Sequence, residues 1–141
     1  MIGIERATHG DLGHICALDC LVLGDSSRRD FLDNAIKSGQ CLVARFDGGV
    51  VGFAVLDQSF FGHGYISLLI VHPEHRRRGV AAALMRHIES ICPTEKLFTS
   101  TNESNEPMQR LCHTLGFVRS GYIDNLDAGD PEIIFFKWVK Q

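Results

Sequence analysis

The residues best suited to chemistry lie in one short segment, Arg-Arg-Arg-Gly-Val-Ala at 76–81. An apolar run precedes this segment and an Ala-rich amphipathic stretch follows it, which predicts a strand leading directly into a helix. The first turn of a helix attracts phosphate oxygens, because its N–H groups have no intrahelical partner and the helix dipole is positive there. Small residues admit the anion, and arginines add charge and forked donors. The segment therefore predicts a pyrophosphate site made by Arg76, Arg77, Arg78, Gly79, Val80 and Ala81.

Two motifs of this chain resemble those of a known family. Arg76-x-x-Gly79-x-Ala81, preceded by Val71-His72-Pro73-Glu74, is similar to the acyl-CoA-binding signature of the GNAT N-acetyltransferase superfamily. The segment Asn105-Glu-Pro-Met-Gln-Arg-Leu-Cys-His-Thr-Leu-Gly116-Phe117 is similar to the helix that follows the fifth strand in that family. The resemblance extends from the region near residue 41 to the end of the chain and is weaker before it.

The resemblance implies a mixed α/β fold of the GNAT type. That fold has a central mixed sheet of about six or seven strands, helices on both faces, and a splay between the fourth and fifth strands. The resemblance also implies acetyl-CoA as co-substrate, with its pantetheine arm in the opening. It makes the N–H of Leu69 the donor that polarises the thioester carbonyl, and it pairs Ile70 and Val71 with the pantetheine amides. Asn105 would cap its helix, bond the pantetheine arm, or do both.

Two positions depart from the family pattern. The strand expected at 64–71 has no carboxylate, whereas many members keep a glutamate there that helps to deprotonate the amine. Cys112 stands where the family often has a tyrosine that protonates the departing thiolate. A thiol titrates in a suitable range for this catalytic role. The alternative is that Cys112 is a small apolar core residue, which is the more common role of a buried cysteine.

An acidic segment offers candidates for the missing base. Four carboxylates surround the expected turn between the last two strands, namely Asp124, Asp127, Asp130 and Glu132. In the family this turn borders the acceptor site, so the cluster could attract a cationic amine, and one member could accept its proton through water. Glu132 is the favoured catalytic member. The alternative is a solvated hairpin loop, since Asp, Gly and Pro are ordinary turn residues.

The elements that must position these residues follow from apolar periodicity and from turn signals. Ser27-x-x-Asp30 approximates a capping box at the start of the second helix, and Asp47-Gly48-Gly49 predicts a tight hairpin. Residues 57–63 are expected to form a loop, whose Phe60 and Phe61 would line the acceptor site or pack in the core. The expected strands are 2–7, 40–46, 50–56, 64–71, 97–101, 117–123 and 132–139, and the expected helices are 11–23, a second ending at Gly39, a third ending near Cys92, and 105–115.

Length and composition limit the remaining possibilities. The 141 residues suit one domain, 1–141, and a net charge of −3 disfavours nucleic acid as a partner. The sequence has neither a membrane-length apolar stretch nor a signal-peptide layout, so a cytoplasmic protein without a membrane partner is expected. Five scattered cysteines favour reduced thiols. His72 and His75 resemble half of a metal site, but no second pair completes it, so no metal is expected.

Two functions of different classes follow. The first is an N-acetyltransferase, a transferase that moves acetyl from acetyl-CoA to a primary amine of a small molecule, peptide or protein within a ternary complex. The acidic surroundings favour a cationic acceptor, and pairing of two copies into a homodimer is frequent in the family. The alternative is a non-catalytic acyl-CoA-binding sensor or interaction protein on the same fold, which the missing carboxylate and tyrosine make conceivable.

Overall fold

A computed structural model describes residues 1–140 of the chain. Two short 3-10 turns, His9–Asp11 and Pro73–His75, precede helices α1 and α3. The helices are α1 (Leu12–Leu23), α2 (Arg29–Lys37), α3 (Val80–Ile91) and α4 (Glu106–Thr114). The strands are β1 (Gly3–Arg6), β2 (Cys41–Phe46), β3 (Gly49–Phe60), β4 (His63–Val71), β5 (Lys96–Asn102), β6 (Val118–Ile123) and β7 (Glu132–Trp138).

The strands form a mixed sheet in the order β1-β2-β3-β4-β5-β7-β6. The strands β4 and β5 are parallel, and their paired residues run from Gly64 opposite Leu97 to Ile66 opposite Thr99. The pairs β1–β2, β2–β3, β5–β7 and β6–β7 are antiparallel. This arrangement confirms the mixed α/β fold class and its parallel section. The splay expected beyond the paired residues stays a prediction.

The chain divides into two compact units that share β3 and β4. The first unit comprises residues 1–56 and 68–88, and the second comprises 57–67 and 89–140. The expectation of one domain stays a prediction.

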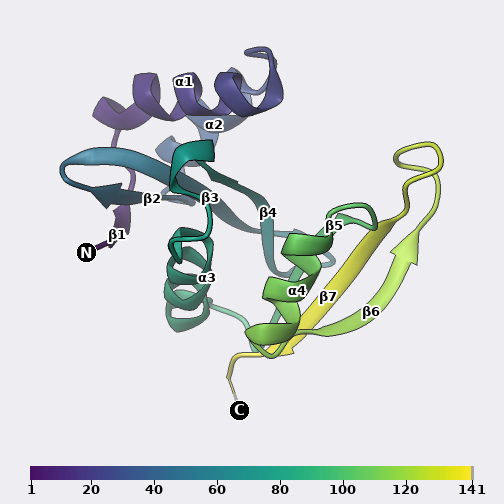
Figure 1. The fold of residues 1–141 in the computed structure, drawn as a ribbon. Helices are drawn as coiled ribbons and strands as arrows, with labels where there is room; N and C mark the ends of the chain where they lie inside the picture. The colour runs from purple at the N-terminus through teal and green to yellow at the C-terminus, as the bar shows by residue number, and fades with distance from the viewer. Residues whose placement is uncertain (141) are drawn as a thin grey trace. The chain divides into compact units, whose positions relative to one another are not determined.

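The first unit has helices on both faces of its strands (Figure 1). Apolar residues of α1 and α2 form a buried cluster with alternate residues of β2 and β3, including Val43, Phe53 and Val55. Gly52 points to the opposite face, where it meets Val80 and Leu84 of α3. Because side chains alternate along a strand, Phe53 and Gly52 direct the two helix layers to opposite faces.

The start of α2 differs from the prediction. Arg28 occupies the N-cap position, and the N–H of Ser27 donates to Asp25 instead. The guanidinium of Arg28 is held by Asp19, which is almost fully buried, through bonds of 2.6 and 3.1 Å. The predicted capping box at Ser27 and Asp30 is therefore wrong, because the ion pair with Asp19 fixes the chain at Arg28.

The second hairpin is longer than predicted. The strand β3 continues through the expected loop to Phe60, and the turn consists of Phe61 and Gly62, which have φ of 54° and 80°. Phe60 stacks on Tyr65 and contacts Phe98, with ring centroids 5.2 and 4.8 Å apart. These aromatic contacts stabilise pairing in a polar stretch that resembles a loop in sequence. The predicted turn at Asp47-Gly48 is confirmed by positive φ at both residues.

In the second unit, α4 covers one face of the strands β5, β6 and β7 (Figure 1). Leu97, Thr99 and Thr101 are buried, whereas the alternate residues of β5 are only partly buried. The His113 ring of α4 lies 5.8 Å from that of buried Phe135, which identifies the covered face. The opposite face of β5 therefore carries Phe98 and Ser100.

Candidate functional site

A tight turn connects β4 to the segment of three arginines. The His72 N–H donates to the Val51 carbonyl at 2.8 Å, and the His72 carbonyl accepts from the His75 N–H at 2.8 Å. The His72 Nδ1 accepts from the Glu74 N–H at 3.1 Å. His72 thus stabilises the turn through both its backbone and its ring, and one ring nitrogen is occupied in doing so.

The segment 76–79 has the backbone geometry of an anion-binding loop. Arg76 is extended, Arg77 has φ of 65° and Gly79 has φ of 81°, immediately before α3 begins at Val80. Alternating left- and right-handed residues turn successive N–H groups toward one side, which is how backbone nests bind anions. The first helical bond of α3 runs from the Ala83 N–H to the Gly79 carbonyl at 2.9 Å. The N–H groups at 79–82 are therefore free of intrahelical partners.

The space in front of this loop is open. A Cβ placed on Gly79 would meet nothing within 4 Å, and the residues 76–79 are all exposed. Arg76, Arg77 and Arg78 carry three guanidinium groups on this exposed loop. The loop thus combines free backbone donors with charged side chains, and its binding of a pyrophosphate stays a prediction.

Gly52 of β3 allows α3 to approach the sheet closely. A Cβ at this position would lie 2.9 Å from Val80 Cγ1 and 3.0 Å from the Ile70 carbonyl oxygen. The first turn of α3, which carries the free N–H groups, is therefore docked where only a glycine fits. Gly52 was not among the residues predicted to shape the site. A glycine inside an apolar strand is the signal that could have found it.

The strand β4 presents alternate peptide groups to its two edges. The His72 N–H points toward β3, so by alternation the N–H of Ile70 points the same way. The Ile70 carbonyl beside Gly52 agrees with this direction, and the Ile70 side chain packs against the core cluster. Leu69 and Val71 point their N–H groups away from β3. The geometry therefore supports Leu69 and Val71 as backbone donors, but it does not support the predicted role of Ile70.

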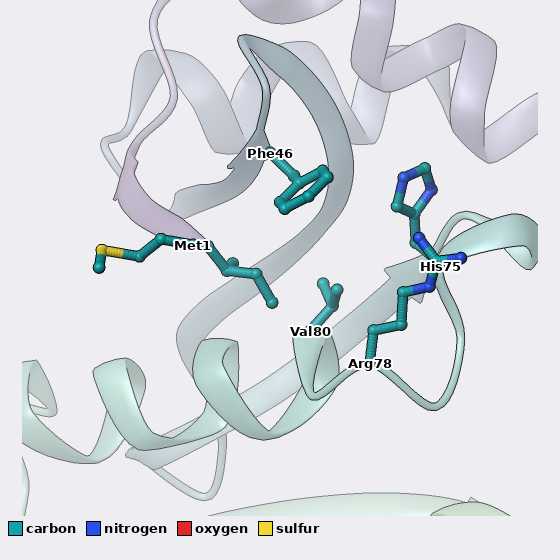
Figure 2. Close-up of a pocket in the computed structure, with 6 residues that line it drawn as sticks. Met1, Phe46, His75, Arg78 and Val80 are labelled. Atoms are coloured by element: carbon teal, nitrogen blue, oxygen red, sulfur yellow. The ribbon is translucent and has the colours of Figure 1, made fainter.

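A pocket of about 240 Å³ lies beside the loop and is lined by Met1, Ile2, Phe46, His75, Arg78 and Val80. Figure 2 shows the Arg78 side chain extending toward the His75 ring, with Phe46 and Val80 on the apolar wall. The His75 and Phe46 rings meet edge to face, with centroids 6.1 Å apart. The aliphatic part of Arg78 thus lies against an apolar surface while its guanidinium stays near the loop.

Asn105 begins α4 in the second unit. Its Oδ1 accepts from the Met108 N–H at 3.3 Å, which confirms the predicted helix cap. Its second predicted role, bonding the pantetheine arm, stays a prediction.

Cys112 is fully buried in the second unit, with 0% of its surface exposed. Burial raises the pKa of its thiol to about 12. A thiol in these surroundings stays protonated and packs as a small apolar residue, which favours the second of the two alternatives for Cys112.

We expect Cys112→Ala to change kcat by less than about twofold and to lower stability by about 1 kcal/mol through the small cavity it leaves. Thermal unfolding and steady-state kinetics check this. Cys92→Ala is the matched control, because Cys92 is equally buried. A loss of kcat confined to Cys112→Ala would instead identify the thiol as an acid.

Three side chains of the second unit form a continuous hydrogen-bonded chain. Tyr65 Oη lies 2.7 Å from Ser100 Oγ, and Ser100 Oγ donates to Glu132 Oε2 at 2.7 Å. Each residue comes from a different strand, in the order β4, β5 and β7. The sequence analysis selected Glu132 but missed Ser100, because the contact depends on the register between strands distant in sequence.

The other carboxylates of the acidic turn mainly hold the backbone. Asp127 accepts from the Asn102 amide at 2.9 Å. Asp130 accepts from both the N–H and the hydroxyl of Ser104, at 3.0 and 2.6 Å. Asp124 is exposed. These contacts give the turn a structural role. Glu132 differs from the other three carboxylates because it accepts from Ser100, which is in turn bonded to Tyr65.

Two further observations concern residues 1–140. Within this range no group of three His, Cys, Asp or Glu side chains is arranged to hold a metal ion. None of the helices described there combines the length and apolar character that crossing a bilayer requires.

Comparisons with known proteins agree with this geometry. The model of the acetyltransferase (GNAT) family matches residues 15–117. An acetyltransferase of the GNAT family from Bacillus cereus is 43% identical, with a TM-score of 0.95 over 98% of this chain and 97% of that one. The yncA protein of Salmonella typhimurium, solved with acetyl-CoA, is 16% identical, with a TM-score of 0.82 over 99% of this chain and 95% of that one.

A mouse protein named cysteine-rich protein 2-binding protein is 35% identical over 72 residues, which are 51% of this chain and 9% of that protein. The matching region is thus a small part of the curated relative. The family model covers most of the chain, and the Bacillus cereus protein matches it along nearly its whole length. The chain therefore belongs to the acetyltransferase (GNAT) family.

Proposed function

We propose that this protein is an acetyl-CoA-dependent N-acetyltransferase that transfers acetyl directly to a primary amine in a ternary complex. The observation that carries the proposal is the loop at 76–79, where two positive-φ residues and the free first turn of α3 face open space. This loop binds the pyrophosphate of acetyl-CoA. The N–H groups of Gly79, Val80 and Ala81 are its donors, and Arg76, Arg77 and Arg78 supply charge.

The strand β4 serves the thioester end of the same co-substrate. The Leu69 N–H, which points away from β3, donates to the thioester carbonyl, and Val71 pairs with the pantetheine. Attack by the amine places negative charge on the carbonyl oxygen, and a donor already aimed there lowers the barrier. Holding the amine and the thioester together supplies much of the remaining rate.

The acceptor is a cationic amine of a small molecule, peptide or protein. The carboxylates at Asp124, Asp127 and Asp130 give the β6–β7 turn a negative charge that attracts such a group. The cytoplasmic location and the homodimer stay predictions.

A non-catalytic acyl-CoA-binding protein is the second candidate. Two observations favour it: β4 carries no carboxylate, and Cys112 is a buried thiol at the position where the family often has a tyrosine. The donor proposed for the carbonyl is a backbone N–H, however, and this group does not depend on either side chain.

The test is acetyl-CoA turnover with a panel of amines, measured by release of free CoA thiol, together with calorimetric binding of CoA. We expect CoA binding and amine-dependent thiol release, strongest with cationic amines. Tight CoA binding without turnover on any amine would support the second candidate, and absence of CoA binding would contradict both.

A further inference from the structure

The hydrogen-bonded side chains of Tyr65, Ser100 and Glu132 lie diagonally across three adjacent strands. Tyr65 pairs with Phe98 in the β4–β5 register, and Ser100 is two residues further along β5. Ser100 in turn pairs with Ile134 of β7, and Glu132 is two residues further again. The three side chains therefore stand on the same face of these strands. We propose that they form a proton relay that removes a proton from the acceptor amine, an inference that rests on the proposed function.

The two hydrogen bonds that join Tyr65, Ser100 and Glu132 run in one direction. Ser100 has a single hydroxyl hydrogen, and it is donated to Glu132 Oε2. The contact of 2.7 Å between Tyr65 and Ser100 must then use the Tyr65 hydrogen, with Ser100 Oγ as acceptor. Both hydrogens point toward the carboxylate. The lone pairs of Tyr65 Oη are left to accept a hydrogen from the amine, so Tyr65 is the catalytic residue that meets the substrate and the other two are positioning residues.

Tyr65 has the properties of a relay member. Burial raises the pKa of its phenol, the hydrogen bond with Ser100 opposes this by a smaller amount, and the nearby carboxylate of Glu132 adds to the rise. The group therefore stays neutral and can accept one proton while it passes on another. Its ring is fixed by stacking on Phe60, with centroids 5.2 Å apart and planes inclined at 27°.

The proposed step balances in protons and electrons. The ammonium form of the acceptor gives a proton to Tyr65 Oη as the Tyr65 hydrogen moves to Ser100 and the Ser100 hydrogen moves to Glu132. The neutral nitrogen then attacks the thioester carbon of acetyl-CoA and forms the C–N bond. The C–S bond breaks, the CoA thiolate takes one of the two protons left on nitrogen, and the amide product keeps the other. Glu132, which is only partly buried, releases its proton to water.

The groups around the relay are themselves acidic. Asp57 of β3 acts electrostatically on Tyr65, as does Glu132. Glu132 lies opposite Asn102 in the β5–β7 register, and the Asn102 amide is bonded to Asp127 and to the Asp130 backbone. These negative groups favour a cationic acceptor, and they are the charges that a pH profile of the relay must take into account.

The experiment measures kcat/KM from about pH 6 to pH 10 with saturating acetyl-CoA for the wild type, Tyr65→Phe, Ser100→Ala and Glu132→Gln. We expect each variant to lose about tenfold near pH 7 and to approach the wild type at high pH, where the free amine needs no base. We also expect the double variant Tyr65→Phe/Glu132→Gln to lose no more than either single variant, because all act through one chain. Ser100→Thr, which keeps the hydroxyl, should restore most of the rate.

Two further measurements separate the possible causes of a loss of rate. CoA affinity measured by calorimetry should be unchanged in every variant, which separates the relay from co-substrate binding. Glu106→Gln removes one exposed carboxylate elsewhere and should leave the pH profile unchanged. Variants that retain the wild-type pH profile, or losses that do not shrink at high pH, would overturn the relay. A wild type that binds CoA but acetylates no amine would overturn the proposed function and the relay with it.

Discussion

Replacing Gly79 by valine will weaken CoA binding on the order of 100-fold, because the loop needs a left-handed residue at this position. Gly79 has φ of 81°, and a β-branched side chain is strained there. The new side chain would also occupy the open space in front of the free N–H groups. We expect Gly79→Ala to lose roughly tenfold, since its single methyl group causes less strain. Calorimetric titration with CoA and with acetyl-CoA measures both variants.

Gly48→Val is the matched control for this prediction. Gly48 has φ of 79° and likewise has no atom within 4 Å of a built Cβ, but it lies in the hairpin turn between β2 and β3. The backbone strain should thus be equal, while CoA affinity stays at the wild-type level. Equal loss of CoA affinity in both variants would mean that strain in the first unit, and not the loop at 76–79, causes the effect.

Local sequence patterns were sufficient for most of the architecture. The apolar runs, the hairpin signal at Asp47-Gly48 and the transition at Arg76–Ala81 predicted the order of strands and helices with small errors at their ends. The loop at 76–79 and the helix start after it could be predicted because they depend on adjacent residues, whereas its binding of a pyrophosphate stays a prediction. A helix start, two positive-φ positions and a group of arginines are all properties of a segment shorter than ten residues.

The features that were missed depend on contacts between distant residues. Asp57-Gln58-Ser59 resembles a loop in sequence and becomes a strand because Phe60 stacks on Tyr65. Ser100 has no distinctive sequence context, and its role emerges only from the register that places it between Tyr65 and Glu132.

The direction of the Ile70 N–H also depends on a contact between distant residues, and its predicted pairing with the pantetheine stays a prediction. The direction of a peptide group is fixed by which neighbour its strand pairs with, and the pairing of His72 with Val51 directs Ile70 toward β3. The family resemblance points to a segment of β4. Which N–H groups of that segment face away from β3 follows only from the observed hydrogen bond between His72 and Val51. The N–H groups of Leu69 and Val71 point the other way because each residue is adjacent to Ile70, which agrees with their proposed role as donors.

Gly52→Ala will lower CoA affinity roughly tenfold and will lower the free energy of unfolding by about 1–3 kcal/mol, the usual cost of overpacking. The added methyl group would lie 2.9 Å from Val80 Cγ1 and 3.0 Å from the Ile70 carbonyl oxygen, so α3 must move away from β3. That movement displaces the N–H groups at 79–82, although none of their side chains is changed. Calorimetry with CoA and chemical denaturation measure the two effects.

Gly64→Ala separates loss of stability from loss of binding. A Cβ at Gly64 would lie 2.5 Å from Cys92 Sγ and 3.0 Å from Thr94 Oγ1, so this variant is also overpacked, but within the second unit. It should lose stability while it binds CoA as the wild type does. The double variant Gly52→Ala/Val80→Ala should recover part of the CoA affinity, since the shorter side chain relieves one of the two close contacts. If Gly52→Ala loses stability but keeps full CoA affinity, the close docking of α3 on β3 does not position the phosphate-binding loop.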